Sequence, residues 1–341
     1  MNYSTWIWIG SLVTFYGVTV FMEKRAAMRG THRAPMSPAV DKGLRLFFLF
    51  LLTFPAMSLF PKVCIPIVLV YLPTFIDGGE KTGKRMSKRF KQMFIWRFFA
   101  RYFQLEVVAT GGKLDPKKSY IIALHPHGFL PFGTMVNVLT NVSNVDEKFL
   151  NGVPLRSLAA SFCFYIPIYR DIILAGGIMD AARYNARQAL HLGNSIALVP
   201  GGASEGLYAH PGTHKLILKK RLGFIKLAME EGVDVVPAYS FGETDCYSQL
   251  SSKLGPGVKA FQSKFQRIFG LSLPLVTNII PRRTKITTVF GKPMKIKHNK
   301  KPTDEEVRAV LDEYIERITQ LFNENAATYI TNPEHRTLEI I

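Results

Sequence analysis

Cysteine is scarce in this sequence of 341 residues, and the three that occur follow no disulfide spacing. Cys64, Cys163 and Cys246 are scattered, so we expect reduced thiols in a reducing compartment. Acidic residues are also few, with 25 Asp and Glu against 43 Lys and Arg and a net charge of +18. This excess predicts an anionic partner, such as a membrane face or a phosphorylated substrate. We do not expect a nucleic-acid partner, because the sequence contains no nucleic-acid-binding motif.

The N-terminal residues 1–90 predict a membrane anchor with basic flanks. Residues 5–22 form an uncharged apolar run, close to the roughly 20 residues that cross a bilayer. Basic residues follow this run and none precedes it, which argues against a signal peptide and places the following chain in the cytosol. A second apolar stretch, 46–75, is broken at Pro61 and predicts a hairpin. Shallow insertion, or a buried hairpin of a soluble domain, is the alternative.

From residue 91 to residue 341, short apolar runs alternate with helical patterns. This alternation predicts an α/β domain with a mostly parallel sheet flanked by helices. Three apolar runs, 120–125, 195–200 and 233–240, end in turns that contain glycine and polar residues. Because parallel strands end at one edge of a sheet, we expect these turns to form a ligand site.

Two patterns near the C-terminal end predict helices. Residues 303–306 fit a capping box at the start of an amphipathic helix. The basic amphipathic pattern of 258–269 fits a helix on a membrane surface or an ordinary core-facing helix.

Two histidines follow the first strand pattern. Pro126 lies between His125 and His127 and restricts His125 to extended backbone, and Gly128 permits a close approach. An imidazole is suited to general-base removal of a proton from an attacking hydroxyl. A pair of structural histidines is one alternative. A metal site is the other, but it needs further ligands that the sequence does not place at zinc-like spacing, so we expect no metal.

The second strand pattern ends in Gly201 and Gly202, with Glu205 close behind. Consecutive glycines can direct backbone amides at a ligand oxygen, and the carboxylate can partner an imidazole. A plain loop with Glu205 at a helix start is the alternative.

Together these motifs resemble the type-2 diacylglycerol acyltransferase family, which includes monoacylglycerol and wax-alcohol acyltransferases. The matching segments, in the family's order, are 125–128, 200–205, 221–228, 236–247 and 286–293. The sequence departs from related patterns in two respects. Gln104 stands where the family often has proline, and Leu130 and Phe132 stand where the His-x4-Asp dyad of glycerol-phosphate acyltransferases would have aspartate.

The resemblance implies transfer of a fatty acyl group from acyl-CoA, a co-substrate, to the hydroxyl of diacylglycerol, which forms triacylglycerol. It implies no cofactor. It also implies a multi-pass protein of the endoplasmic reticulum membrane, or of the lipid droplet surface, with a cytosolic catalytic domain in contact with membrane lipids. A monoacylglycerol or wax-alcohol acceptor, or a non-catalytic lipid-droplet scaffold, is the alternative. The sequence leaves open whether the protein forms a homo-oligomer.

In this interpretation His127 removes the proton, Glu205 orients and charges its imidazole, and His125 supports His127 or exchanges roles with it. Amides of the glycines stabilise the oxyanion, and basic side chains bind the phosphates of coenzyme A. The residues expected to contact substrate are Pro126, Gly128, Gly201, Gly202, Arg221, Lys226, Glu243 and Tyr247.

Overall fold

The computed structural model describes residues 61–249, 257–258, 260–262, 275–278 and 280–341. The expected span 5–22, the first arm of the hairpin and most of the 258–269 pattern therefore lie outside the described residues. The second arm is helix α3 (Pro61–Phe75). Within the described ranges, Pro61–Thr82 is the one helical stretch long and apolar enough to cross a membrane, with a mean hydropathy of 1.4.

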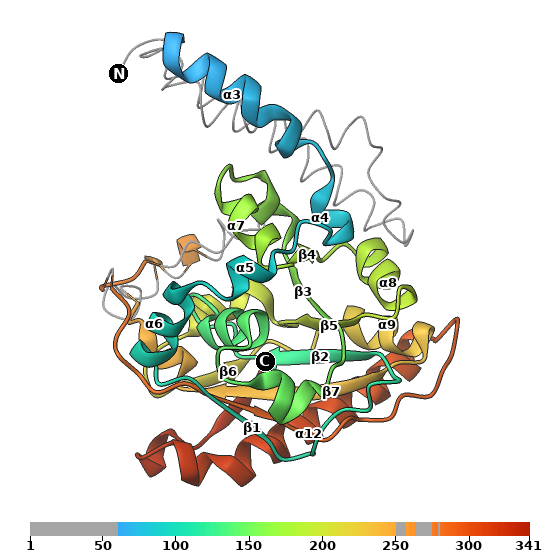
Figure 1. The fold of residues 1–341 in the computed structure, drawn as a ribbon. Helices are drawn as coiled ribbons and strands as arrows, with labels where there is room; N and C mark the ends of the chain where they lie inside the picture. The colour runs from blue at the N-terminus through green and yellow to red at the C-terminus, as the bar shows by residue number, and fades with distance from the viewer. Residues whose placement is uncertain (1–60, 250–256, 259, 263–274, 279) are drawn as a thin grey trace.

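A seven-stranded sheet of order β1-β8-β7-β2-β5-β3-β4 forms the centre of the domain (Figure 1). Every neighbouring pair is parallel except β7 with β8, so the expected α/β fold with a mostly parallel sheet is confirmed. The strands are β1 (Glu106–Ala109), β2 (Tyr120–His125), β3 (Leu155–Ala159), β4 (Met179–Asp180), β5 (Ser195–Leu198), β7 (Asp234–Phe241) and β8 (Thr287–Phe290).

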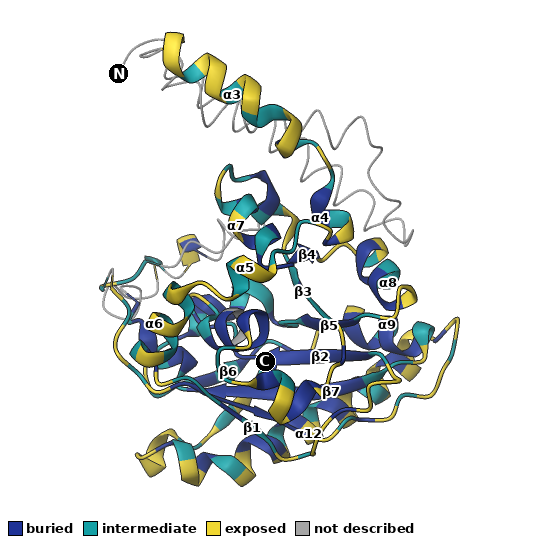
Figure 2. Ribbon diagram, in the orientation of Figure 1, coloured by how far each residue is buried: buried dark blue, intermediate teal, exposed yellow. Residues whose placement is uncertain are grey.

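Strand β2 lies at the centre of the sheet and is buried along its whole length. Its side chains alternate between the two faces, as the strand period requires. Ile121 and Ala123 join the core under helices α8 (Arg183–His191), α9 (Gly223–Glu231) and α12 (Asp304–Tyr329). Ile122 and Leu124 join the core under the π-helices η1 (Gly133–Val138) and η2 (Asp146–Leu150). Both faces of the sheet are therefore covered, as Figure 2 shows by the dark strands.

The three strands whose turns were expected to meet are neighbours. β2 pairs in parallel with β7 on one side and with β5 on the other. Their carboxyl ends therefore lie at one edge of the sheet, next to the turns that begin at His125, Pro200 and Gly242.

Shorter elements complete the domain. A parallel pair, β6 (His214–Leu216) with β9 (Leu338–Ile340), forms a second sheet. The 3₁₀ helices are η3 (Ser161–Tyr165), η4 (Gly202–Tyr208), η5 (Glu243–Cys246) and η6 (Pro333–His335), and the remaining α-helices are α4 (Gly79–Thr82), α5 (Lys88–Lys91), α6 (Phe94–Tyr102) and α7 (Tyr169–Ala175).

Gln104, the departure from the family pattern, has a φ of +43°. The ring of proline fixes φ near −65°, so proline does not fit the backbone found here.

The capping box at the start of α12 is confirmed and gives a test of stability. The Thr303 hydroxyl accepts from the Glu306 amide (3.2 Å), and the Glu306 carboxylate accepts from the Thr303 amide (2.7 Å). Replacing Thr303 with Ala leaves an amide of the first turn unpaired, so we expect the free energy of unfolding to fall by about 1 kcal/mol. Thermal unfolding of the detergent-solubilised chain measures the change. Thr337→Ala, at an exposed position outside the helices, is the control, and an equal effect of both variants would contradict the capping role.

Candidate active site

His125 is the last residue of β2, and its side chain is fully enclosed. Its Nε2 lies 2.9 Å from the Tyr314 hydroxyl of α12. Its Nδ1 lies 3.9 Å from the Glu205 carboxylate and has no hydrogen-bond partner. A residue that is 0% exposed is poorly placed to reach an acceptor hydroxyl, so this geometry favours a supporting position for His125.

His127 is partly exposed, in contrast to its neighbour. Its Nδ1 lies 3.1 Å from the Gly128 carbonyl oxygen. Because a carbonyl oxygen only accepts, Nδ1 carries the proton in this contact, and Nε2 keeps its lone pair. Burial lowers the pKa of His127 below its usual value of 6.5, against the raising effects of the Gly128 carbonyl and the Glu205 charge. The imidazole is therefore mainly neutral at pH 7, which is the state a general base needs.

Glu205 joins two loops through its buried carboxylate. One oxygen accepts from the backbone amide of His127 (2.9 Å), and the other accepts from the backbone amide of Ile217 (3.0 Å). The carboxylate therefore positions the backbone of His127, whereas a hydrogen bond to its ring was expected. A Cβ at Gly201 would lie 1.9 Å from a Glu205 oxygen, so this position requires glycine.

Glu243 holds the other end of the segment that follows the histidines. Its carboxylate, 2% exposed, accepts from the amides of Phe132 and Gly133, both at 2.7 Å. Burial raises the pKa of Glu243 to about 8, although the two amides oppose the shift. We call residues 127–133 the histidine loop. Two buried acidic side chains thus hold this loop, Glu205 at its start and Glu243 at its end.

Tyr247 packs against the histidine loop from the side. Its ring centroid lies 4.5 Å from that of Phe129 and 6.4 Å from that of Phe132. These rings belong to an apolar cluster that includes Phe99 of α6 and Phe103, which follows the helix. Glu243 and Tyr247 thus both lie at the site, and each contacts the histidine loop. Their expected contact with an acceptor stays a prediction.

One of the two glycine amides that were expected to face a ligand oxygen has a partner within the chain. The amide of Gly202 donates to the Val199 carbonyl (3.0 Å), so it is already engaged. Arg221 donates from its guanidinium to the carbonyl of Gly201 (2.8 Å) and to Ser204 (3.2 Å), which fixes the turn.

Lys226, the other basic residue expected at the site, has a different neighbour. Its ammonium lies 3.6 Å from Asp304 and joins α9 to the first turn of α12. The structure therefore brings Arg221, but not Lys226, into contact with the loops that carry the site.

Two contacts at the site could not be predicted from the sequence. Tyr314 lies 189 residues from His125, and the sequence shows it only as one apolar position of a helix pattern. The Ile217 amide binds Glu205 through its backbone, which leaves no trace in residue type. Among the described residues, His, Cys, Asp and Glu side chains form no group of three that is suited to a metal.

Fold and site together define an α/β protein with a histidine-centred site at the carboxyl edge of a mostly parallel sheet. The sequence model of diacylglycerol acyltransferase matches residues 57–340. The chain therefore belongs to the diacylglycerol acyltransferase family.

Curated relatives cover most of the chain. Diacylglycerol O-acyltransferase 2 of Dictyostelium discoideum is 37% identical over 79% of this chain and 84% of its own length. Diacylglycerol O-acyltransferase 2B of Umbelopsis ramanniana is 34% identical, over 83% of each chain. 2-Acylglycerol O-acyltransferase 1 of Bos taurus is 33% identical over 82% of this chain and 90% of its own. A solved 1-acyl-sn-glycerophosphate acyltransferase from Thermotoga maritima aligns with 15% identity over 83% of this chain and 97% of its own, at a TM-score of 0.37.

The raised pKa of Glu243 predicts how stability depends on pH. The pKa is about 8 in the folded chain and near 4.5 when the carboxyl is exposed, so the folded state binds more protons between these values. Stability contributed by the protonated carboxyl is therefore present at pH 4.5 and is lost as pH rises towards 8. Thermal midpoints of the wild type should fall across this window relative to those of Glu243→Gln, which cannot ionise. A constant difference between the two chains across the window would contradict the shifted pKa.

Proposed function

We propose that this chain transfers a fatty acyl group from acyl-CoA to the hydroxyl of diacylglycerol and so forms triacylglycerol. This proposal rests on the imidazole of His127, which is partly exposed, has a lowered pKa and keeps a lone pair on Nε2. Family membership and the two relatives named diacylglycerol O-acyltransferase support the choice of substrates.

The proposed reaction is a direct transfer between the two substrates. Nε2 of His127 takes the proton of the acceptor hydroxyl while the hydroxyl oxygen attacks the thioester carbonyl carbon. The tetrahedral intermediate collapses, the carbon–sulfur bond breaks, and the imidazolium returns its proton to the departing thiolate. We assign the oxyanion donor to the backbone amide of Gly128, the residue that follows His127.

A thiol nucleophile is not part of this mechanism. Burial raises the pKa of Cys163 to about 11 and raises the pKa of Cys246 as well, so both thiols stay protonated at neutral pH. A thioester is already activated, which removes the need for an acyl-enzyme intermediate.

A membrane setting fits an acceptor that is itself a lipid. Helix α3 precedes the domain, and its apolar surface is suited to the bilayer in which diacylglycerol resides. We place the protein in the endoplasmic reticulum membrane as a multi-pass chain with its catalytic domain in the cytosol, and at the lipid droplet surface.

One relative supports a second acceptor. The Bos taurus relative is named 2-acylglycerol O-acyltransferase, which makes monoacylglycerol the alternative acceptor for this chain. Such an enzyme would use the same base and the same acyl donor, and would differ in the pocket that holds the acceptor.

The first test is acyl transfer in microsomes that contain the full chain. Labelled acyl-CoA is supplied with diacylglycerol, monoacylglycerol or a long-chain alcohol. We expect triacylglycerol from the wild type and a loss of roughly 10²- to 10⁴-fold in His127→Ala, the contribution usual for a general base. His191→Ala, at an exposed position on α8, is the control and should keep full activity.

Three results would count against this proposal. Activity retained in His127→Ala at matched expression would make His127 structural. Absence of transfer to all three acceptors would favour a non-catalytic scaffold, and a preference for monoacylglycerol would favour the alternative acceptor.

The pH dependence of the rate tests the protonation state of His127. Because burial lowers its pKa, kcat/KM should fall on the acid side with a midpoint below 6.5. Initial rates in vesicles of fixed composition, at limiting acyl-CoA, measure this limb. An acid limb centred above pH 7 would assign it to another group.

A further inference from the structure

Helix α3 presents apolar side chains to its surroundings along most of its length. Of its 15 residues only Phe75, the last, is buried. Its exposed apolar residues include Val63, Ile67, Leu69 and Val70. Figure 2 shows the helix projecting from the domain with an exposed surface. Such a surface fits the hydrocarbon of a bilayer, which is how α3 is interpreted above.

A second group of exposed apolar side chains lies on the catalytic domain, at the start of α7. Ile168 is 72% exposed and has a φ of +68°, and Ile172 is 44% exposed one turn later. We call these two residues the α7 corner. A β-branched residue at positive φ is strained, and it keeps this backbone conformation only where the surrounding structure fixes it. The domain therefore displays an apolar side chain here at a conformational cost.

The α7 corner is level with the last turn of α3. The backbone amide of Ile168 donates to the Tyr71 hydroxyl at 3.1 Å, and this hydroxyl also donates to the Asp171 carboxylate. Tyr71 precedes Phe75 by about one helical turn. The α7 corner therefore lies beside the last turn of α3.

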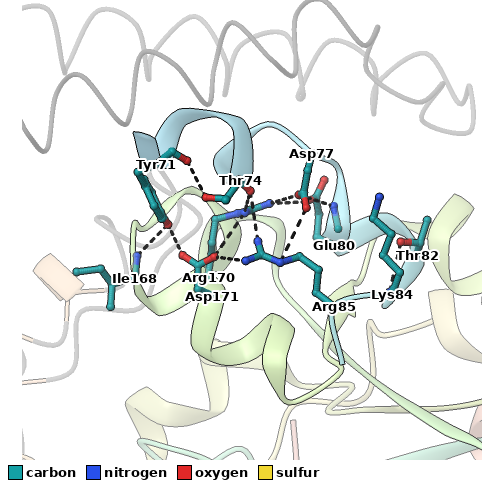
Figure 3. A network of polar contacts seen from close by, with 11 residues as sticks. Tyr71, Thr74, Asp77, Glu80, Thr82, Lys84, Arg85, Ile168, Arg170 and Asp171 are labelled. Carbon is teal, nitrogen blue, oxygen red and sulfur yellow. Dashed lines mark hydrogen bonds and ion pairs between the residues drawn. The ribbon is translucent and has the colours of Figure 1, made fainter. Parts of the chain in front are cut away.

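A buried ionic network holds the corner in this place, as Figure 3 shows. Arg170, which is fully buried, donates to Glu80 (2.9 Å), to Asp77 (3.3 Å) and to the carbonyl oxygen of Thr74. Arg85 lies 2.8 Å from the Asp171 carboxylate. Because breaking a buried ion pair leaves an unpaired charge, the corner and the end of α3 form one unit.

We propose that the α7 corner is a second membrane contact, which inserts Ile168 and Ile172 into the interfacial layer of the bilayer that receives α3. Continuity with α3 identifies the bilayer as the partner. Exposed basic residues on the segment after α3 suit its anionic headgroups, namely Lys84, Lys88 and Arg89. Together with α3, this contact fixes the orientation of the domain relative to the bilayer. It rests on the membrane attachment proposed for α3 and not on the identity of the acceptor.

The test measures the depth of the corner in proteoliposomes that contain the full chain. Ile168→Trp and Ile172→Trp are each compared with the parent, whose three tryptophans give a constant background. Vesicles contain phosphatidylcholine brominated near the headgroup, with phosphatidylserine. We expect the bromolipid to quench the added emission of both variants. Leu192→Trp, exposed at the end of α8, is the control, and its added emission should persist.

Ile172 lies within helix α7, so Ile172→Trp alone tests the membrane contact if a tryptophan at Ile168 perturbs folding. Absence of quenching at Ile172 and Ile168 would overturn the proposal. Shielding from aqueous iodide without bromolipid quenching would also overturn it and would indicate a second copy or another protein on this surface. Acyl transfer in the same vesicles is scored separately, because quenching needs no turnover. Quenching without transfer would count against the proposed function alone.

Discussion

The hydrogen bond from the His127 amide to the Glu205 carboxylate is the contact on which the arrangement of the site depends. It joins the turn after β2 to the turn after β5, two segments that are 78 residues apart. A buried carboxylate is costly unless it is hydrogen-bonded, and here backbone amides supply both partners. Because amides do not titrate, this junction keeps its donors at every pH at which the chain folds.

Glycines are required where these turns meet. A Cβ at Gly206 would lie 2.9 Å from the Gly128 carbonyl oxygen, and one at Gly133 would lie 2.5 Å from a Glu243 oxygen. At Gly206 the close neighbour is a backbone carbonyl group, and at Gly133 it is a side-chain carboxyl group. The histidine loop is thus shaped by close contacts at both ends, which leaves the His127 ring as its partly exposed polar group.

Much of this site was predictable because it lies in local sequence patterns. Strand ends with glycine and polar residues indicated the edge of the sheet, and the neighbouring turns brought His127, Glu205 and Glu243 together as expected. What could not be predicted is which atom each carboxylate binds. Residue type fixes the hydrogen-bonding capacity of Glu205, but whether it meets the ring or the amide of His127 depends on how two turns pack.

Long-range partners were also beyond the sequence. Tyr314 occupies an apolar position in the amphipathic pattern of α12, and such a position carries no sign that its hydroxyl reaches His125. Lys226 was grouped with Arg221 because both belong to one basic motif. Arg221 precedes α9 and Lys226 lies within it, so one meets Gly201 and the other Asp304.

The connection between anchor and domain shows the same limit on a larger scale. A change in composition near residue 91 suggested where the catalytic domain begins. In the structure, contacts with the domain reach further towards the N-terminus, since the amide of Ser87 donates to Ala175 and Glu80 binds Arg170. The apolar composition of α3 predicts a membrane helix, whereas the charged residues that follow it, Asp77 and Glu80, make the contacts with Arg170 of the domain. For the lipid acceptor proposed above this matters, because the buried Arg170 network fixes the distance between the end of α3 and the domain.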